Sequence, residues 1–249
     1  MKMFDFKGRT AIVTGASQGL GKEIARIFAE AGAHVIVNCA HHIERAEAVA
    51  GELRQAGFSA MAYQCDVSNE EAVRKMFKEL GAVDILINNA RLDPYFRTAE
   101  MSESQWFMKT MEVNVLGAYL MSMVFLEQAK ERKWGRIVNI SSSRAYTPAE
   151  PRMVAYNISK LSLHALSRSF AAQGAPYNIT ANTVAPGFVQ TENVSKRLTP
   201  EAVANEVGKI PLQRTGSMRE MAEAVLFAAG NGYVTGDVIN VNGGQFYTP

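Results

Sequence analysis

The alternation of short β-branched runs with longer amphipathic stretches constrains the fold of this chain more than any other feature. Such an alternation is typical of parallel strands joined by crossover helices. The predicted strands are Thr10 to Thr14, His34 to Asn38, Ser59 to Gln64, Asp84 to Asn88, Arg136 to Ser141, Ile179 to Val184 and Asp237 to Val241. Because parallel sheets are covered on both faces, the pattern predicts an α/β fold.

The stretches between these runs have apolar residues at three- and four-residue spacing, which predicts helices. They are Gly19 to Ala31, Ile43 to Ala56, Asn69 to Leu80, Ser102 to Lys130 and Met153 to Ala172, with two further segments within Thr191 to Gly230. No linker rich in Pro, Gly or Ser divides the series. We therefore predict one domain over residues 1–249, a single doubly wound (Rossmann-type) parallel sheet of about seven strands with helices on both faces.

The two longest predicted helices, around Met108 to Lys130 and Met153 to Ala172, hold more Met, Ala and Leu than one sheet face needs. These helices could pack against another subunit. Alternatively, the methionines fill irregular gaps in the core. The sequence leaves both readings open for Met108, Met111, Met121 and Met123.

Charge and cysteine content exclude several classes of function. A formal charge of +2, with no stripe of Lys and Arg, argues against nucleic acid as a partner. Residues Met1 to Thr10 lack an apolar targeting segment and no apolar run reaches spanning length, so we expect a cytoplasmic protein without membrane contact. Cys39 and Cys65 lack both disulfide-framework and metal-ligand spacing, so no metal site is expected.

A glycine-rich turn between the first strand and the first helix predicts a dinucleotide site. Glycines let the turn be tight and let the backbone approach a pyrophosphate, and the helix N-terminus offers free N–H groups. A glycine trio alone is weak evidence, and its place between a strand and a helix strengthens it. The candidate cofactor-binding residues are Gly15, Ser17, Gln18, Gly19, Leu20 and Gly21.

The end of the second strand bears on the choice between NAD and NADP. An enzyme that prefers NAD usually has Asp or Glu there to bind the ribose hydroxyls, and that carboxylate repels a 2′-phosphate. This chain has Asn38 instead, followed by Cys39, Ala40, His41 and His42. Either histidine could supply a donor or lie in a solvated loop. The absence of the acid favours NADP, and NAD remains open.

Tyr156 and Lys160 open a helical pattern with a spacing that places them on one face, one turn apart. A tyrosine with an ordinary pKa near ~10 is a poor base at neutral pH, but an adjacent ammonium favours the phenolate. Such a pair is also common on protein surfaces, so its surroundings matter. Ser141 to Ser143 end the fifth predicted strand, at the edge where open α/β sheets bind ligands. A hydroxyl there could hold a substrate oxygen while Tyr156 donates or accepts its proton.

Over essentially its whole length the chain resembles the short-chain dehydrogenase/reductase family. The resemblance is carried by Thr14-Gly15-x-x-x-Gly19-x-Gly21, Asp66-Val67, Asn88-Asn89-Ala90, Asn114 in a Val-Asn-x-x-Gly context, the serines, Tyr156-x-x-x-Lys160, Pro186-Gly187 and a C-terminal Thr235-Gly236-Asp237 to Gly243-Gly244 segment. The motifs occur in the family's order at the expected strand ends, which makes the match specific.

The resemblance implies a hydride transfer between a nicotinamide cofactor and a small ketone or secondary alcohol. Tyr156 would be the general acid/base, and Lys160 would lower its pKa and hold the nicotinamide ribose. Asn114 would anchor a water in a proton relay through Lys160, and Ser142 would orient the carbonyl. Alignment on the strand favours Ser142, whereas counting back from Tyr156 favours Ser143.

The resemblance also assigns the remaining cofactor contacts. Family members assemble as tetramers or dimers through the two long helices, so a homotetramer or homodimer is expected. Asp66 and Val67 would hold the adenine, Asn88 and Ala90 would lie beside the ribose, and the carboxamide end would be bound by Pro186, Gly187, Val189 and Thr191.

Some residues depart from the family pattern. Arg91 replaces the family's glycine after Asn-Asn-Ala, close to the nicotinamide site, while Arg144 and Arg152 precede Tyr156. Arginine suits carboxylate or phosphate recognition, so we hypothesise an anionic substrate; solvated surface arginines are the alternative.

The sequence leaves two alternative functions open. The chain resembles 3-oxoacyl-carrier-protein reductases in length and motifs, but such enzymes carry basic residues at the catalytic entrance. Here Lys133 could serve, and the stretch from Gln173 to Tyr177 offers no arginine. A non-catalytic NAD(P)-binding sensor is the alternative from another class. Such proteins usually lack the tyrosine, lysine or serine that this chain retains.

Overall fold

The computed structural model describes residues 4–191, 194 and 197–246. Within these residues seven strands form one sheet, in the order β3-β2-β1-β4-β5-β6-β7. Every neighbouring pair is parallel, which confirms the predicted doubly wound sheet. The strands are β1 Thr10–Val13, β2 His34–Cys39, β3 Ala60–Gln64, β4 Ile85–Asn88, β5 Gly135–Ile140, β6 Ile179–Pro186 and β7 Val238–Val241.

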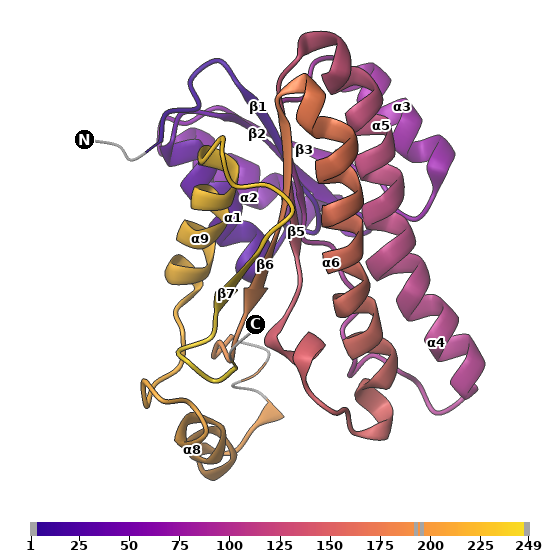
Figure 1. The fold of residues 1–249 in the computed structure, drawn as a ribbon, viewed down its shortest axis with the longest axis vertical. Helices are drawn as coiled ribbons and strands as arrows, with labels where there is room; N and C mark the ends of the chain where they lie inside the picture. The colour runs from indigo at the N-terminus through magenta and orange to yellow at the C-terminus, as the bar shows by residue number, and fades with distance from the viewer. Residues whose placement is uncertain (1–3, 192–193, 195–196, 247–249) are drawn as a thin grey trace.

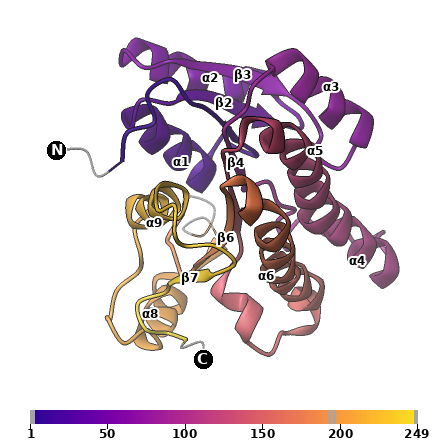
Figure 2. The ribbon, with the colours of Figure 1, turned by 45° about the horizontal axis from the view of Figure 1, so that its top comes forward.

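Helices cover both faces of the sheet, as Figure 1 shows with the sheet seen nearly edge-on. One face carries α1 (Gly19–Glu30), α2 (Ile43–Gln55) and α9 (Met218–Gly230). The other carries α3 (Glu70–Leu80), α5 (Gly117–Arg132) and α6 (Val154–Gly174). Figure 2 shows α4 (Glu103–Met111) continuing the line of α5 beside α6, and α8 (Pro200–Gly208) beyond the end of the sheet.

Alternate residues of each strand enter opposite cores, because side chains in a strand alternate between its two faces. Val35 and Val37 pack under α1 and α2, while Ile36 between them packs under α3. Both faces of the central strands are therefore buried, which explains why their sequences are continuous apolar runs.

Strands β1 and β4 are neighbours at the point where the strand order reverses. From β1 the chain continues to β2 and β3 on one side, and from β4 it continues to β5, β6 and β7 on the other. In such sheets, ligands bind in the crevice outside the carboxyl ends of the strands at this switch point. Four of the predicted motifs follow β1, β3, β4 and β5 and therefore meet at this edge.

The long helix predicted over Ser102 to Lys130 is interrupted. It divides into α4 and α5, separated by a five-residue π-helical turn, η1, at Glu112–Leu116. An extra residue in a helical turn does not disturb the apolar spacing enough to be seen in a sequence. Such turns are rare and occur frequently at functional sites, and this one contains Asn114.

The methionines of these helices serve different purposes. Met121 is fully buried and Met123 packs against the same core, whereas 64% of Met108 is exposed. Core filling therefore accounts for Met121 and Met123, and Met108 lies on an outer surface.

Other boundaries differ by one or two residues from the sequence prediction. Strand β5 ends at Ile140, so Ser141 to Ser143 follow the strand rather than end it. Two short 3₁₀ turns that the apolar pattern does not reveal, η2 (Ser143–Tyr146) and η3 (Pro151–Met153), lead from β5 to α6. In the described part of the chain, no helix is long and apolar enough to cross a membrane.

Candidate active site

Tyr156 and Lys160 lie one turn apart at the start of α6, as their spacing predicts. Lys160 Nζ is 5.7 Å from the centre of the Tyr156 ring, and Tyr156 is half-buried. Lys160 is 1% exposed, and its Nζ donates a 2.8 Å hydrogen bond to the carbonyl oxygen of Ile140. The pair is therefore held against the carboxyl end of β5.

The charge of Lys160 depends strongly on its surroundings. Burial removes water from the ammonium and, with a smaller contribution from repulsion by Arg91, lowers the pKa of Lys160 to about 7. An ammonium has three donors, and among the described residues the Ile140 carbonyl takes one. A ligand with acceptor atoms beside Lys160 would favour the charged form. The sequence alone gives no sign of this burial.

The three serines after β5 have different environments. Ser141 and Ser143 are each 4% exposed, whereas Ser142 is partly exposed. Ser141 Oγ donates to the carbonyl oxygen of Lys160 at 2.8 Å, and Ser142 Oγ accepts from the Arg144 backbone N–H at 3.2 Å. Of the two candidates left open by the sequence, Ser142 is the more accessible to a substrate.

Asn114 joins the loop after β4 to the helix that carries the tyrosine. Its Oδ1 accepts from the Leu92 N–H at 2.7 Å, and its Nδ2 donates to Ser159 Oγ at 2.9 Å. Ser159 Oγ in turn donates to the Tyr156 carbonyl oxygen at 2.7 Å. The π turn thus places a buried amide where it connects three segments of the site.

The glycine loop has the shape that a close backbone approach requires. Gly15 and Gly19 adopt φ values of +61° and +55°, which favour glycine. A Cβ on Gly15 would lie 2.9 Å from the Cα of Ala90. Helix α1 begins at Gly19 with neither a side-chain cap on its N–H groups nor an acidic residue in its first turn. This end of α1 therefore suits an anion such as a pyrophosphate.

Gly21 allows the loop and helix to meet, and this contact gives a test. An added Cβ would lie 2.5 Å from the Gly15 carbonyl oxygen and 2.6 Å from Asn89 Nδ2. We expect Gly21→Ala to displace the loop and weaken dinucleotide binding by about tenfold or more, measured by isothermal titration calorimetry.

Gly208 provides the matched control, because a Cβ there meets nothing within 4 Å. The Gly208→Ala variant should bind dinucleotide as the natural protein does. Equal affinity in the Gly21→Ala variant would show that the loop does not form the binding surface.

A clamp between the ends of β1 and β4 supports this loop. Thr14 Oγ1 accepts from the backbone N–H groups of Asn89 and Ala90, both at 2.9 Å. Asn89 Nδ2 donates to the carbonyl oxygens of Thr14 and Gly15 at 2.9 and 3.0 Å. The sequence motifs contained Thr14 and Asn89, but their reciprocal bonding could not be inferred from them.

Asn38 has a buried side chain. Its Nδ2 donates to the carbonyl oxygens of Cys65 and Tyr63 at 3.0 and 3.3 Å, so it ties β2 to β3. His41 and His42, just after β2, are both exposed. The site predicted at Asn38 therefore presents two histidines to solvent, while the Asn38 amide bonds within the sheet.

Three other predicted cofactor residues lie at or just after the ends of β3 and β4. Burial opposes ionisation of Asp66, but hydrogen bonds from the backbone N–H and hydroxyl of Ser68 outweigh it and lower the pKa of the carboxyl. Val67 is buried against Gly117. Asn88 Nδ2 donates to Asn139 Oδ1 at 2.8 Å and so braces β4 against β5.

The segment after β6 is fixed at its start. The Gly187 N–H donates to the Val241 carbonyl oxygen at 2.8 Å, and a Cβ on Gly187 would lie 2.6 Å from Asn242 Cα. Val189 bridges to Gly216, and Thr191 Oγ1 accepts from the Val194 N–H. Pro186 ends β6, so this predicted set, too, lies at the carboxyl edge.

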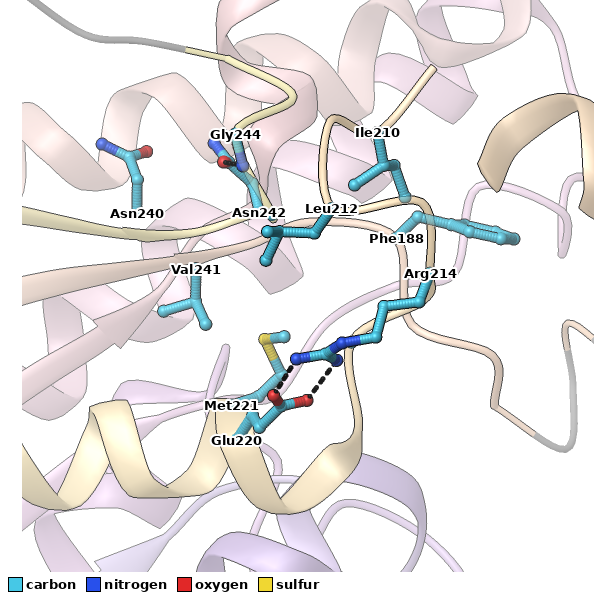
Figure 3. Close-up of a pocket in the computed structure, with 12 residues that line it drawn as sticks. Phe188, Ile210, Leu212, Arg214, Glu220, Met221, Asn240, Val241, Asn242 and Gly244 are labelled. Carbon is cyan, nitrogen blue, oxygen red and sulfur yellow. Dashed lines mark hydrogen bonds and ion pairs between the residues drawn. The ribbon is translucent and has the colours of Figure 1, made fainter. Parts of the chain in front are cut away.

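A cavity of about 260 Å³ lies behind this segment (Figure 3). Phe188, Met221 and Val241 are among its lining residues, and the paired side chains of Arg214 and Glu220 lie beside it. None of the predicted catalytic residues lines it, so we do not assign the reaction to this cavity.

Arg91 belongs to a cluster of charges beside the site. Its Nη1 is 3.3 Å from Asp93 Oδ2, and Arg197 binds both oxygens of Asp93 at 3.0 and 3.1 Å. Burial opposes ionisation of Asp93, but the two arginines outweigh it and hold its pKa below the ordinary value. One carboxylate thus faces two guanidinium groups. Sequence reasoning identified Arg91 but missed Asp93 and Arg197.

The other two arginines noted in the sequence pair with glutamates. The Arg144 guanidinium is 3.7 Å from Glu206 Oε2, and that of Arg152 is 3.3 Å from Glu150 Oε2. Both side chains are more than half exposed. Their charges are already offset at the surface.

Comparison with known proteins identifies this arrangement. A family model described as short chain dehydrogenase matches residues 9–202. The chain belongs to the short-chain dehydrogenase family. An oxidoreductase of unspecified substrate from Thermotoga maritima is 38% identical over 97% of this chain and 98% of its own. A 3-oxoacyl-[acyl-carrier-protein] reductase from Aquifex aeolicus is 36% identical over 96% of this chain and 98% of its own.

Solved structures of dehydrogenases have the same fold. A gluconate 5-dehydrogenase from Burkholderia cenocepacia, in complex with NADP and tartrate, superposes with a TM-score of 0.87 at 30% identity, covering 97% of this chain and 96% of its own. A 7α-hydroxysteroid dehydrogenase with NADH and 7-oxo glycochenodeoxycholic acid gives a TM-score of 0.87 at 32% identity, covering 96% of this chain and 95% of its own. This short-chain dehydrogenase is therefore an NAD(P)-dependent oxidoreductase that interconverts a carbonyl and an alcohol. The predicted enzyme class is confirmed.

Proposed function

We propose that this dehydrogenase is NADP-linked and interconverts a small ketone that carries an anionic group and the corresponding secondary alcohol. The observation that carries the proposal is the Tyr156 and Lys160 pair at the switch-point edge, with Arg91 beside it. The dinucleotide supplies or accepts the hydride at its nicotinamide ring. The chain's own residues bind the substrate and move the proton.

Tyr156 is the proposed general acid in reduction and the general base in oxidation. Its hydroxyl gives a proton to the substrate oxygen or takes one from it. Ser142 holds the same oxygen, a role supported by its exposure relative to buried Ser143. Lys160 stabilises negative charge on the phenol oxygen and binds the nicotinamide ribose.

Asn114 is proposed to anchor a water that passes a proton to Lys160. Its position in a π turn beside the buried start of α6 supports this role. Direct hydrogen bonds to Leu92 and Ser159 fix the Asn114 side chain, so it would act without moving.

The cofactor site is proposed to run from the glycine loop to the segment after β6. The uncapped start of α1 and the cradle at Gly15 and Gly21 fit a pyrophosphate. The ionised Asp66 fits the amino group of an adenine. The remaining proposed contacts are Ser17, Gln18, Gly19, Leu20, Val67, Asn88, Ala90, Pro186, Gly187, Val189 and Thr191.

The preference for NADP has local support. The end of β2 carries Asn38 where an acid would repel a 2′-phosphate, and that side chain bonds within the sheet. His41 is exposed and close enough to Asp66 to lower the pKa of that carboxyl. The histidine therefore borders the adenine end, where it could donate to the phosphate.

Arg91 is proposed to recognise the anionic group of the substrate. Its side chain is 42% exposed, and it lies close enough to Lys160 to lower the pKa of that buried ammonium. The structurally similar gluconate 5-dehydrogenase binds tartrate, a dicarboxylate, together with NADP. This likeness supports a substrate of the hydroxy-acid or keto-acid class.

The Arg91→Gly variant tests this recognition. We expect KM for small keto acids to rise by about tenfold or more, while KM for their methyl esters changes little, because only the acid loses a charged hydrogen bond. Steady-state oxidation of NADPH, followed at fixed enzyme concentration, measures both.

The Arg74→Gln variant controls for general loss of positive charge, because Arg74 lies on α3, is 49% exposed and pairs with Glu70. It should leave the ratio of KM for the keto acid to KM for its methyl ester as it is in the natural protein. If Arg91→Gly also leaves that ratio unchanged, the substrate is not recognised through Arg91.

Reduction of a 3-oxoacyl thioester on a carrier is the second candidate. The 36% identical reductase from Aquifex aeolicus carries this name. The segment just before β6 argues against a carrier-protein substrate, because it has Tyr177 rather than an arginine. Lys130 Nζ lies 5.4 Å from the centre of the Tyr177 ring. Acetoacetyl-CoA as a probe distinguishes the two, since a carrier-type reductase should turn it over faster than any small keto acid.

We also propose a homo-oligomer, tetrameric or dimeric, in the cytoplasm. A groove of about 1080 Å³ crosses the surface of α4 and α5, and its lining includes Met108, Leu116 and Tyr119. Leu161 on α6 is 51% exposed. Another copy of this surface would cover these side chains. Cys39 and Cys65 are free and buried, which suits a reducing compartment.

A further inference from the structure

His164 is a buried titratable residue that the proposed reaction does not use. It lies in α6 one turn after Lys160 and is 3% exposed. Burial, with a smaller contribution from Arg168, lowers its pKa to about 4. The imidazole is therefore neutral at neutral pH and has one N–H.

The hydrogen bonds at Ser141 decide which nitrogen carries that proton. Ser141 Oγ lies 2.8 Å from the Lys160 carbonyl oxygen and 2.8 Å from His164 Nε2. The carbonyl oxygen can only accept, so it takes the single hydroxyl proton of Ser141. His164 must then donate from Nε2 to Ser141 Oγ, which leaves Nδ1 without a proton.

This arrangement ties the end of β5 to Lys160 in both directions. Lys160 Nζ donates to the carbonyl of Ile140, and the hydroxyl of the next residue, Ser141, donates to the carbonyl of Lys160. His164 fixes the direction of the second bond. Ile140, the last residue of β5, and Ser141 after it therefore hold the side chain and the backbone of the lysine.

His164 also contacts the chain on the other side of Ser142. Its ring lies 5.3 Å from the ring of Tyr146, at the end of η2, with a tilt of 46°. Contacts to Ser141 and Tyr146 thus bracket the proposed carbonyl-binding serine.

We propose that His164 is a positioning residue, which as its Nε2–H tautomer sets the Ser141 hydroxyl onto Lys160 and thereby holds Ser142 and Lys160 at a fixed separation. The proposal rests on the function given above for those two residues. It adds a residue that touches neither substrate nor cofactor but acts through Ser141.

Nitrogen NMR of ¹⁵N-histidine-labelled enzyme tests the tautomer without any reaction. The chain has four histidines, and a His164→Gln sample identifies the signals of His164. We expect a protonated Nε2 and an unprotonated Nδ1 at pH 7, and mixed tautomers in Ser141→Ala. A protonated Nδ1 in the natural protein would overturn the proposal whether or not the enzyme reduces ketones.

Kinetics of two variants test the positioning. His164→Leu removes the donor and should lower kcat by about tenfold through misplacement of the serine and lysine, with a smaller rise in the dinucleotide Kd because the lysine keeps its charge. His164→Gln keeps a donor at the same reach and should recover most of that loss. Each rate is divided by the concentration of dinucleotide-binding sites, so that unfolded protein does not lower the kcat of a variant.

His34 provides the matched control, because its Nδ1 bonds Ser59 Oγ at 2.7 Å near the opposite edge of the sheet. His34→Leu should leave kcat unchanged. Equal kcat in the Leu and Gln variants of His164 would overturn the positioning role. A natural enzyme that reduces no carbonyl, yet shows the Nε2–H signal, would contradict the proposed function and not the tautomer.

Discussion

Replacing Tyr156 with Phe should lower kcat for carbonyl reduction by about 10²–10⁴-fold, the usual contribution of a positioned general acid. The variant removes one oxygen from a half-buried ring at the start of α6 and leaves the ring in place. Lys160 keeps its bond to the Ile140 carbonyl. The loss should therefore fall on proton transfer, with the dinucleotide Kd within a few-fold of the natural value.

Stopped-flow measurement of NADPH oxidation under single-turnover conditions separates the chemical step from binding and release. Tyr233→Phe is a suitable control, because this tyrosine is 99% exposed and lies in none of the proposed binding surfaces. It should react at the natural rate. A Tyr156→Phe variant that retains more than a tenth of the natural rate would remove the tyrosine from its proposed role.

Lys160→Met should produce a second large effect, in catalysis and in the pH dependence of stability. Without the ammonium, charge on the phenol oxygen loses its nearest stabilising cation, and kcat should fall by about 10²-fold or more. The nicotinamide ribose would lose a donor as well, so the dinucleotide Kd should rise. Both effects appear in the same NADPH titration and turnover assay.

The stability effect follows from the lowered pKa of Lys160. In the cofactor-free protein this pKa is about 7, below the ordinary value of 10.5. Between these two values the unfolded chain binds more protons than the folded protein, so the free energy of unfolding rises with pH. Lys160→Met removes this titration and should flatten the rise.

Urea unfolding of the natural protein and the Met variant at several pH values from 7 to 10 measures the difference between their slopes. Taking the difference cancels other groups, including Cys65, whose pKa is raised to about 11 by burial. Identical slopes would mean that the buried lysine is fully charged without cofactor. The attribution of its lowered pKa to burial would then be wrong.

The sheet and the tyrosine and lysine pair were predictable because both follow from local periodicity. The continuous apolar run Val35 to Val37 indicated a strand buried on two faces, and the structure places its residues in both cores. The four-residue spacing of Tyr156 and Lys160 fixed their shared helix face. The order of the motifs then placed them at one edge of the sheet.

Features that depend on contacts distant in sequence were not predictable. Arg197 and Asp93 are 104 residues apart, and no local pattern joins them. The Asn38 amide at the end of β2 bonds carbonyls of Tyr63 and Cys65, which only the pairing of β2 with β3 brings near. Likewise, the residue spacing predicted which helix face carries Lys160, but it did not predict that the side chain is almost fully buried.

A crystal structure of the enzyme with NADP⁺ tests the central claim most directly. We predict the pyrophosphate on the backbone N–H groups of the Gly15 to Gly21 turn and the nicotinamide ribose on Lys160 Nζ. The Tyr156 hydroxyl should face the nicotinamide ring. A dinucleotide bound away from the glycine turn, or a Tyr156 hydroxyl directed away from the ring, would contradict the account.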